Sequence, residues 1–125
     1  MTRHNCRSPK GSAAVEFALV LPVILAVLVG VVEVAVVARI HLEVVAAARE
    51  GAREAAANPD PAGAVAAVNR SLGPLASVAR ITVRRPHVVG ATAEVEVRLP
   101  HRLAAVVFGG MGIELRGRSS MRVER

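Results

Sequence analysis

The pattern of hydrophobic and polar positions begins with a polar, basic stretch that leads directly into a long apolar one. Residues 1–11 read MTRHNCRSPKG, and residues 17–32 read FALVLPVILAVLVGVV. A helix over residues 12–38 would extend about 40 Å at 1.5 Å per residue, whereas the hydrocarbon core of a bilayer is about 30 Å thick. The pattern therefore predicts a helix that can span a membrane.

Small and helix-breaking residues lie inside this apolar stretch. Pro22 and Gly30 are both tolerated in transmembrane helices, and the proline predicts a kink in the membrane helix. Ala26 and Gly30 form a small-xxx-small pair, which can allow a second helix to approach closely. We identify this pair as a candidate helix-packing site.

The pattern changes after residue 38 without losing its helical period. Apolar or small residues recur at spacings of three or four, and charged residues occupy the positions between them: Ile40, Val44, Ala47, Gly51 and Ala55 form the apolar face. Residues 39–57 are thus predicted to be an amphipathic continuation of the first helix. The prolines at 59 and 61 end it, because proline disfavours helix at the preceding residue and lacks a backbone donor.

A short second helix is predicted from Pro61 to about Leu72. Asp60 is its expected N-cap, and Gly73 lies just past its end. The period then becomes two in residues 78–85 and 91–99, which predicts a hairpin of two half-buried antiparallel strands. Its outer face would set arginines of the first strand against glutamates of the second.

A third strand is predicted over residues 113–123, where the alternation returns. The apolar run at 103–108 is too short to span a membrane and is expected to be a helical turn or loop that covers the sheet. The predicted fold class is α+β: a long N-terminal helix, then a small antiparallel three-stranded sheet in a head domain, residues 58–125. The whole chain has two Phe and no Trp or Tyr, so the head needs the apolar face of residues 40–55 across its sheet.

Charge adds an orientation to this organisation. Arg3, Arg7 and Lys10 precede the apolar stretch, so the positive-inside rule predicts a cytoplasmic N-terminus and a head outside the cell membrane. The net charge of +6 would suit nucleic acid, but the other basic residues are spread among acids, without a basic stripe or interleaved aromatics. We therefore expect no nucleic-acid partner.

Candidate chemistry is sparse. Cys6 is the single cysteine and lies in the first segment, so neither an intramolecular disulfide nor an all-cysteine metal site can form. The four histidines are scattered, without the paired spacing of a zinc site, and no nucleotide-binding or nucleophile-elbow motif occurs. We predict no catalytic residues, no metal, no cofactor and no small-molecule substrate.

The junction between the basic stretch and the helix carries the most specific motif. Gly11 ends the basic segment, small or apolar residues follow, and Glu16 occupies the fifth position after the glycine. This arrangement resembles the processing site of type IV prepilins. More narrowly, residues 11–55 resemble the TadE-like pseudopilins of tight-adherence pilus systems, whereas the head follows only that family's loose pattern of strands that end in a polar segment such as SSMRVE.

The resemblance implies a function and a set of partners. Residues 1–11 would be a leader peptide that prepilin peptidase removes between Gly11 and Ser12. The mature chain would be a minor pilin or pseudopilin in the bacterial cytoplasmic membrane, a single-pass protein that packs against other pilin subunits and inner-membrane assembly proteins. Whether it enters the fibre is left open, and Ser12 in place of phenylalanine leaves N-terminal methylation open as well.

The resemblance also implies a role for Glu16. A carboxylate at the edge of an apolar helix is costly unless it has a partner. After cleavage, the α-amino group of Ser12 on an adjoining copy could neutralise it. The alternative is that Glu16 merely reaches the cytoplasmic headgroups. Glu33, about 31 Å from Ser12 along the helix, is predicted to be a solvated carboxylate at the outer interface.

Two other interpretations remain. The first 38 residues could be a cleaved signal peptide of a secreted binding protein, or the chain could be a permanently anchored extracytoplasmic domain without processing. N-terminal sequencing distinguishes them: Ser12 supports the pilin, residue 39 the secreted protein, and Met1 or Thr2 the permanent anchor.

Overall fold

The computed structural model describes residues 9–103 and 109–124, and it has the predicted α+β architecture. A long N-terminal helix precedes a short helix, a 3-10 turn and a three-stranded antiparallel sheet of order β1-β2-β3. The elements are α1 (Pro9–Ala57), α2 (Pro61–Leu72), η1 (Gly73–Ser77), β1 (Arg80–Arg84), β2 (Thr92–Arg102) and β3 (Gly112–Arg122).

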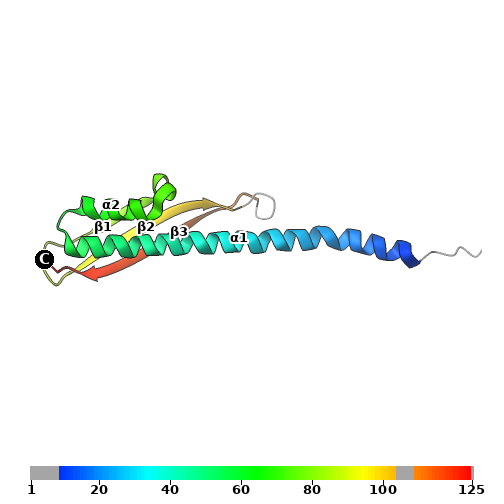
Figure 1. The fold of residues 1–125 in the computed structure, drawn as a ribbon, viewed down its shortest axis with the longest axis horizontal. Coiled ribbons are helices and arrows are strands. Elements are labelled where there is room, and N and C mark those ends of the chain that lie inside the picture. Colours follow the sequence, from blue (N-terminus) through cyan, green and yellow to red (C-terminus); the bar gives the residue numbers. More distant parts are fainter. Residues whose placement is uncertain (1–8, 104–108, 125) are drawn as a thin grey trace, which may run out of the picture.

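The helix α1 is a rod whose N-terminal half protrudes from the rest of the molecule (Figure 1). Residues 11–29 are exposed throughout, and partial burial begins at Gly30 and Glu33. Among the described residues, α1 is the one helix that is long and apolar enough to cross a membrane, and its most apolar window has no buried residue. The helix continues through Pro22, where the kink stays a prediction.

The docked half of α1 lies across the sheet, as the amphipathic pattern predicts. Val44, Ala47 and Ala55 are fully buried in the same cluster as the inward side chains of β2. The small residues let backbones come close together. At Gly117 in β3, an added Cβ would lie 2.7 Å from the carbonyl oxygen of Val44, so glycine is needed for this approach of helix to sheet.

The second helix has the predicted bounds and cap. The carboxylate of Asp60 accepts a hydrogen bond of 2.9 Å from the backbone N–H of Ala62, and Gly73 follows the last residue with φ of 53°. This helix packs against α1 at Gly51, where a Cβ would overlap the side chain of Val68.

The sheet confirms the predicted alternation and extends it. Ala93, Val95, Val97 and Leu99 of β2 are all buried on the face toward α1. The strand β2 runs to Arg102, beyond the predicted end at 99. Its pairing with β1 stops at Arg98, and beyond this point β2 has a neighbour on one side only, which is where a strand tolerates a residue such as Pro100.

The charge pairing on the outer face differs from the prediction. Arg84 of β1 is opposite Glu94 as expected, but Arg80 is opposite Arg98. Both glutamates instead pair with Arg118 of β3, whose guanidinium lies 3.0 Å from Glu94 and 3.3 Å from Glu96, and Glu96 also pairs with Arg98 of its own strand at 2.6 Å. The prediction was wrong in its choice of strand, because it considered only the hairpin neighbour of β2.

Two predicted segments lie at least partly outside the described residues. These are the leader, of which residues 1–8 are not described, and the covering turn, of which residues 104–108 are not described. The helix begins at Pro9 and continues without interruption across the predicted boundaries at 11 and 38.

Candidate functional site

The junction residues are accessible at the N-terminal end of α1. Gly11, Ser12 and Glu16 are exposed, and nothing lies within 4 Å of the Cβ position of Gly11. The hydroxyl of Ser12 donates a hydrogen bond of 3.2 Å to Glu16 Oε1, one helical turn away. The carboxylate therefore stands on the surface of the helix, where a group from outside the chain can reach it.

From residue 17 to residue 32 the surface of α1 is apolar. Its exposed side chains include Phe17, Leu19, Val23, Val27 and Val31, all more than half exposed. Such a continuous apolar surface is stable in lipid or against other apolar helices, and not in water. The helix thus fits a single-pass membrane anchor.

The candidate packing pair lies on this exposed surface. Ala26 is exposed, Gly30 is half-buried, and no atom lies within 4 Å of the Cβ position of Gly30. The two residues are one turn apart, so the structure leaves space beside them for a second helix. The proposed contact stays a prediction.

Glu33 is not the solvated carboxylate that the sequence predicts. Its side chain is 16% exposed, and its Oε1 lies 3.8 Å from Nε2 of His101, which is itself 22% exposed. His101 comes from the end of β2, far away in the sequence. The prediction was wrong because the head folds back over this turn of α1, and nothing in the local pattern identifies His101 as the residue that arrives there.

Next to this pair lies an apolar groove of about 440 Å³ between α1 and the sheet. Its lining residues come from the last turns before the docked half of α1 and from the ends of β2 and β3: Glu33, Val34, Val37, Ala38, His41, Leu103, Ile113 and Leu115. No local sequence pattern indicates this groove, because it forms only when β2 and β3 meet α1.

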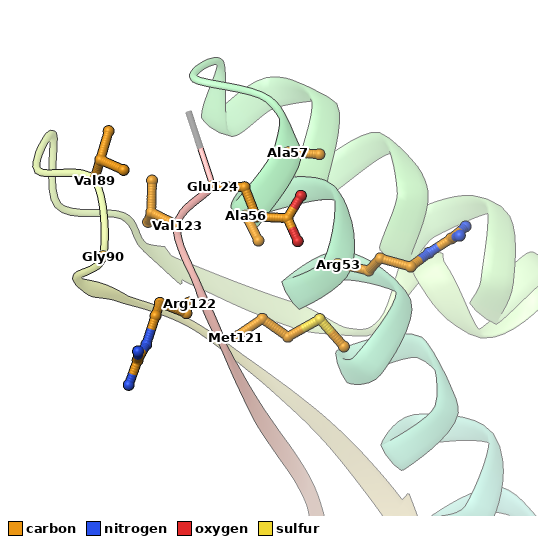
Figure 2. Close-up of a pocket in the computed structure, with 9 residues that line it drawn as sticks. All are labelled: Arg53, Ala56, Ala57, Val89, Gly90, Met121, Arg122, Val123 and Glu124. Atoms are coloured by element: carbon orange, nitrogen blue, oxygen red, sulfur yellow. The ribbon is translucent and has the colours of Figure 1, made fainter.

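A second depression, of about 610 Å³, lies at the opposite end of the head (Figure 2). The side chains of Arg53 and Arg122 point away from each other, and the backbone N–H of Glu124 donates to the carbonyl of Ala56 at 3.1 Å. The polar groups do not converge on a common point. This depression is where the end of the chain is fastened to the end of α1, and the geometry assigns it no chemistry.

A further contact fastens the same end of α1. Nε of Arg85 donates a hydrogen bond of 2.7 Å to the carbonyl of Ala55, one of the last carbonyls of the helix. A cation near a helix C-terminus also interacts favourably with the helix dipole. Within residues 9–103 and 109–124, no group of three side chains has the arrangement of a metal site.

Comparison with known proteins relates the first part of the chain to a known family. No curated protein and no solved structure matches the chain. The matching family model, described as TadE-like protein, covers residues 11–53, and it ends before the second helix and the sheet. The match confirms the resemblance that the junction and the apolar run predict: this part of the chain, from Gly11 to the docked half of α1, is similar to the TadE-like family.

Proposed function

We propose that the chain is a minor pilin or pseudopilin of a tight-adherence pilus system, and that it acts by packing its apolar helix against other pilins and the assembly machinery. The observation that carries the proposal is the exposed carboxylate of Glu16 on a bare apolar helix, five positions after an accessible glycine. The TadE-like match over residues 11–53 supports it. Catalysis has no part in this function.

The exposed junction supports processing by a prepilin peptidase. Gly11 has open space around it, and cleavage after it would leave Ser12 with a free α-amino group. Within one chain the hydroxyl of Ser12 already reaches Glu16. An amine on an adjoining copy would bring a full positive charge to the same carboxylate, and a charge-assisted contact is roughly twice as strong as a neutral one.

The partners follow from the surfaces of α1. The membrane would surround the bare half of the helix, and neighbouring pilin helices would pack at the small residues Ala26 and Gly30. The basic leader places the N-terminus in the cytoplasm and the head outside. Inner-membrane assembly proteins would recognise the same helix, and we propose no nucleic acid, cofactor or small-molecule substrate.

The test compares wild-type chain with Glu16→Gln in a bacterium that has a tight-adherence system. We expect N-terminal sequencing of the membrane fraction to begin at Ser12 in both. We expect site-specific crosslinking to neighbouring pilins to fall about tenfold in the variant, which corresponds to about 1.4 kcal/mol. The physical reason is that an amide cannot hold the ammonium group as a carboxylate does.

Glu43→Gln is the matched control, because Glu43 lies on the same helix beyond the membrane span, where it pairs with Arg39 at 3.2 Å. It should leave crosslinking unchanged. Equal crosslinking of Glu16→Gln and wild type would contradict the proposed role of Glu16. A mature chain that begins at residue 39 would support the secreted alternative, and one that begins at Met1 or Thr2 the permanent anchor.

A further inference from the structure

The end of the sheet where β2 and β3 meet points along α1 toward its protruding half (Figure 1). The contact between His101 and Glu33 shows how far along α1 this end of the sheet reaches. The last residues of β2 lie beside the turn of α1 that contains Glu33, and we call this position the level of Glu33. Pairing of the two strands continues to Leu103, whose N–H donates to the carbonyl of Met111 at 2.9 Å. The groove described above opens at this same level.

The depth of this level in a bilayer follows from the spacing of charges along α1. Glu16 and Glu33 are about 26 Å apart along the helix axis, and no charged residue lies between them. The hydrocarbon core is about 30 Å thick. If Glu16 lies at the inner boundary, Glu33 lies about 4 Å inside the outer one, and tilting the helix would only bring Glu33 deeper.

A head domain that reaches the level of Glu33 must therefore enter the outer interface of the membrane. The covered state of Glu33 fits this position, because a carboxylate near hydrocarbon needs shielding, and the ring of His101, with Nε2 at 3.8 Å from Glu33 Oε1, shields it at a distance beyond a hydrogen bond.

The surface at this level has the chemistry of an interfacial contact. Met111 is 58% exposed and Val34 is 66% exposed, while Leu103 and Ile113 are half-buried on the groove wall. Arg102, exposed at the end of β2, is placed to meet anionic headgroups. An apolar surface with a basic group beside it is typical of protein segments that lie in the boundary between headgroups and acyl chains.

We propose that this end of the head, with Leu103, Met111 and the groove beside Glu33, lies in the outer lipid interface, and that lipid is what covers the groove. The proposal rests only on the membrane anchoring in the proposed function. It does not depend on cleavage at Gly11 or on assembly with other pilins.

The test uses the full chain with Cys6→Ser, reconstituted at one copy per nanodisc containing phosphatidylcholine and phosphatidylglycerol. An environment-sensitive fluorophore is attached to Met111→Cys, and quenching is measured with a nitroxide near the top of the lipid acyl chains and with aqueous iodide. We expect quenching by the lipid nitroxide to be roughly twofold or more above that of a probe outside the membrane, with weaker quenching by iodide.

Val89→Cys is the matched control, because Val89 is 65% exposed and apolar, yet it lines the depression beside Ala57 at the far end of α1. That level is about 36 Å beyond Glu33 along the helix. Its probe should be quenched by iodide and not by lipid. A probe at Val27→Cys, in the middle of the bare helix, reports whether α1 spans the bilayer at all.

The outcomes separate the two proposals. If the probe at 27 is not quenched by a nitroxide deep in the acyl chains, the anchor itself fails, and the proposed function fails with it. If the probe at 27 is quenched but the probe at 111 behaves like the one at 89, only the interfacial proposal is overturned. A probe at 111 that is shielded from both quenchers would mean that protein covers this surface, which also overturns it.

Discussion

The glycine at position 117 sets the distance between α1 and the sheet. Gly117 is buried in the middle of β3, and a Cβ built there would lie 2.7 Å from the carbonyl oxygen and 2.9 Å from the carbonyl carbon of Val44. Both atoms belong to the backbone of α1, which cannot shift locally as the end of a flexible side chain can. Packing at this position therefore depends on glycine.

We expect Gly117→Ala to destabilise the head by about 1–3 kcal/mol, because the helix must move away from the sheet to admit the methyl group. Urea unfolding of the full chain in detergent micelles, followed by circular dichroism, measures this change. Gly112→Ala is the matched control: it makes the same substitution at the start of the same strand, where nothing lies within 4 Å of the Cβ position. Equal losses in the two variants would refute the steric explanation.

At the same scale, the predictability of a residue depended on how far away its partners lie in the sequence. Asp60 and Gly73 were predicted correctly as the ends of α2, because capping is decided within a few residues. Gly11, Ser12 and Glu16 also form a local motif, whose role stays a prediction. Glu33 was mispredicted, since its covering residue, His101, is brought to it only by the fold.

Among the elements, β2 and β3 are joined on their outer face by charges as well as by the backbone ladder. The hydrogen bond from Arg98, with a second from Arg118, lowers the pKa of Glu96 below its ordinary value. A carboxyl group with a lower pKa in the folded state stabilises the fold above its unfolded pKa. This contribution is lost as the pH falls through the lower, folded pKa.

We therefore expect acid to weaken the wild-type sheet more than a variant without this carboxylate. Urea midpoints measured between about pH 7 and about pH 3 should fall less steeply for Glu96→Gln than for wild type. Arg118→Gln should also flatten the profile, but by less, because Arg98 remains hydrogen-bonded to Glu96 at 2.6 Å. Parallel profiles for all three chains would show that these contacts do not couple to folding.

The elements themselves were largely predictable, and their lateral contacts were not. The alternation of β2 predicted its buried side chains, because the period of two decides which residues face the core. It could not show that Glu94 and Glu96 pair with Arg118, because the residues of β3 that lie beside them are decided only when the three strands assemble. The groove beside Glu33 was missed for the same reason.

For the whole molecule, the helix α1 contributes both the candidate membrane span and part of the core of the head. Val44, Ala47, Ala48, Ala52 and Ala55 are fully buried and pack in one cluster with β2 and α2. The predicted head domain, residues 58–125, would lack all of them. A domain of this size with a single Phe and no Trp or Tyr has little other apolar surface to bury.

We expect a fragment of residues 37–125 to fold and a fragment of residues 58–125 not to fold. Without the helix, the inward face of the sheet would be left in water, which removes most of the hydrophobic stabilisation. Circular dichroism and amide hydrogen exchange distinguish the two cases. Slow exchange of β2 amides in the shorter fragment would show that the sheet and α2 suffice.

The uninterrupted helix from Pro9 to Ala57 also has a mechanical consequence. No flexible linker separates the span from the head, so a pull on the head is transmitted to the span along a stiff shaft. Such a load acts in shear on the contacts between α1 and the sheet. The hydrogen bonds to the carbonyls of Ala55 and Ala56 share it. With the proposed anchoring, traction on the head would therefore reach the bilayer without an elastic element between them.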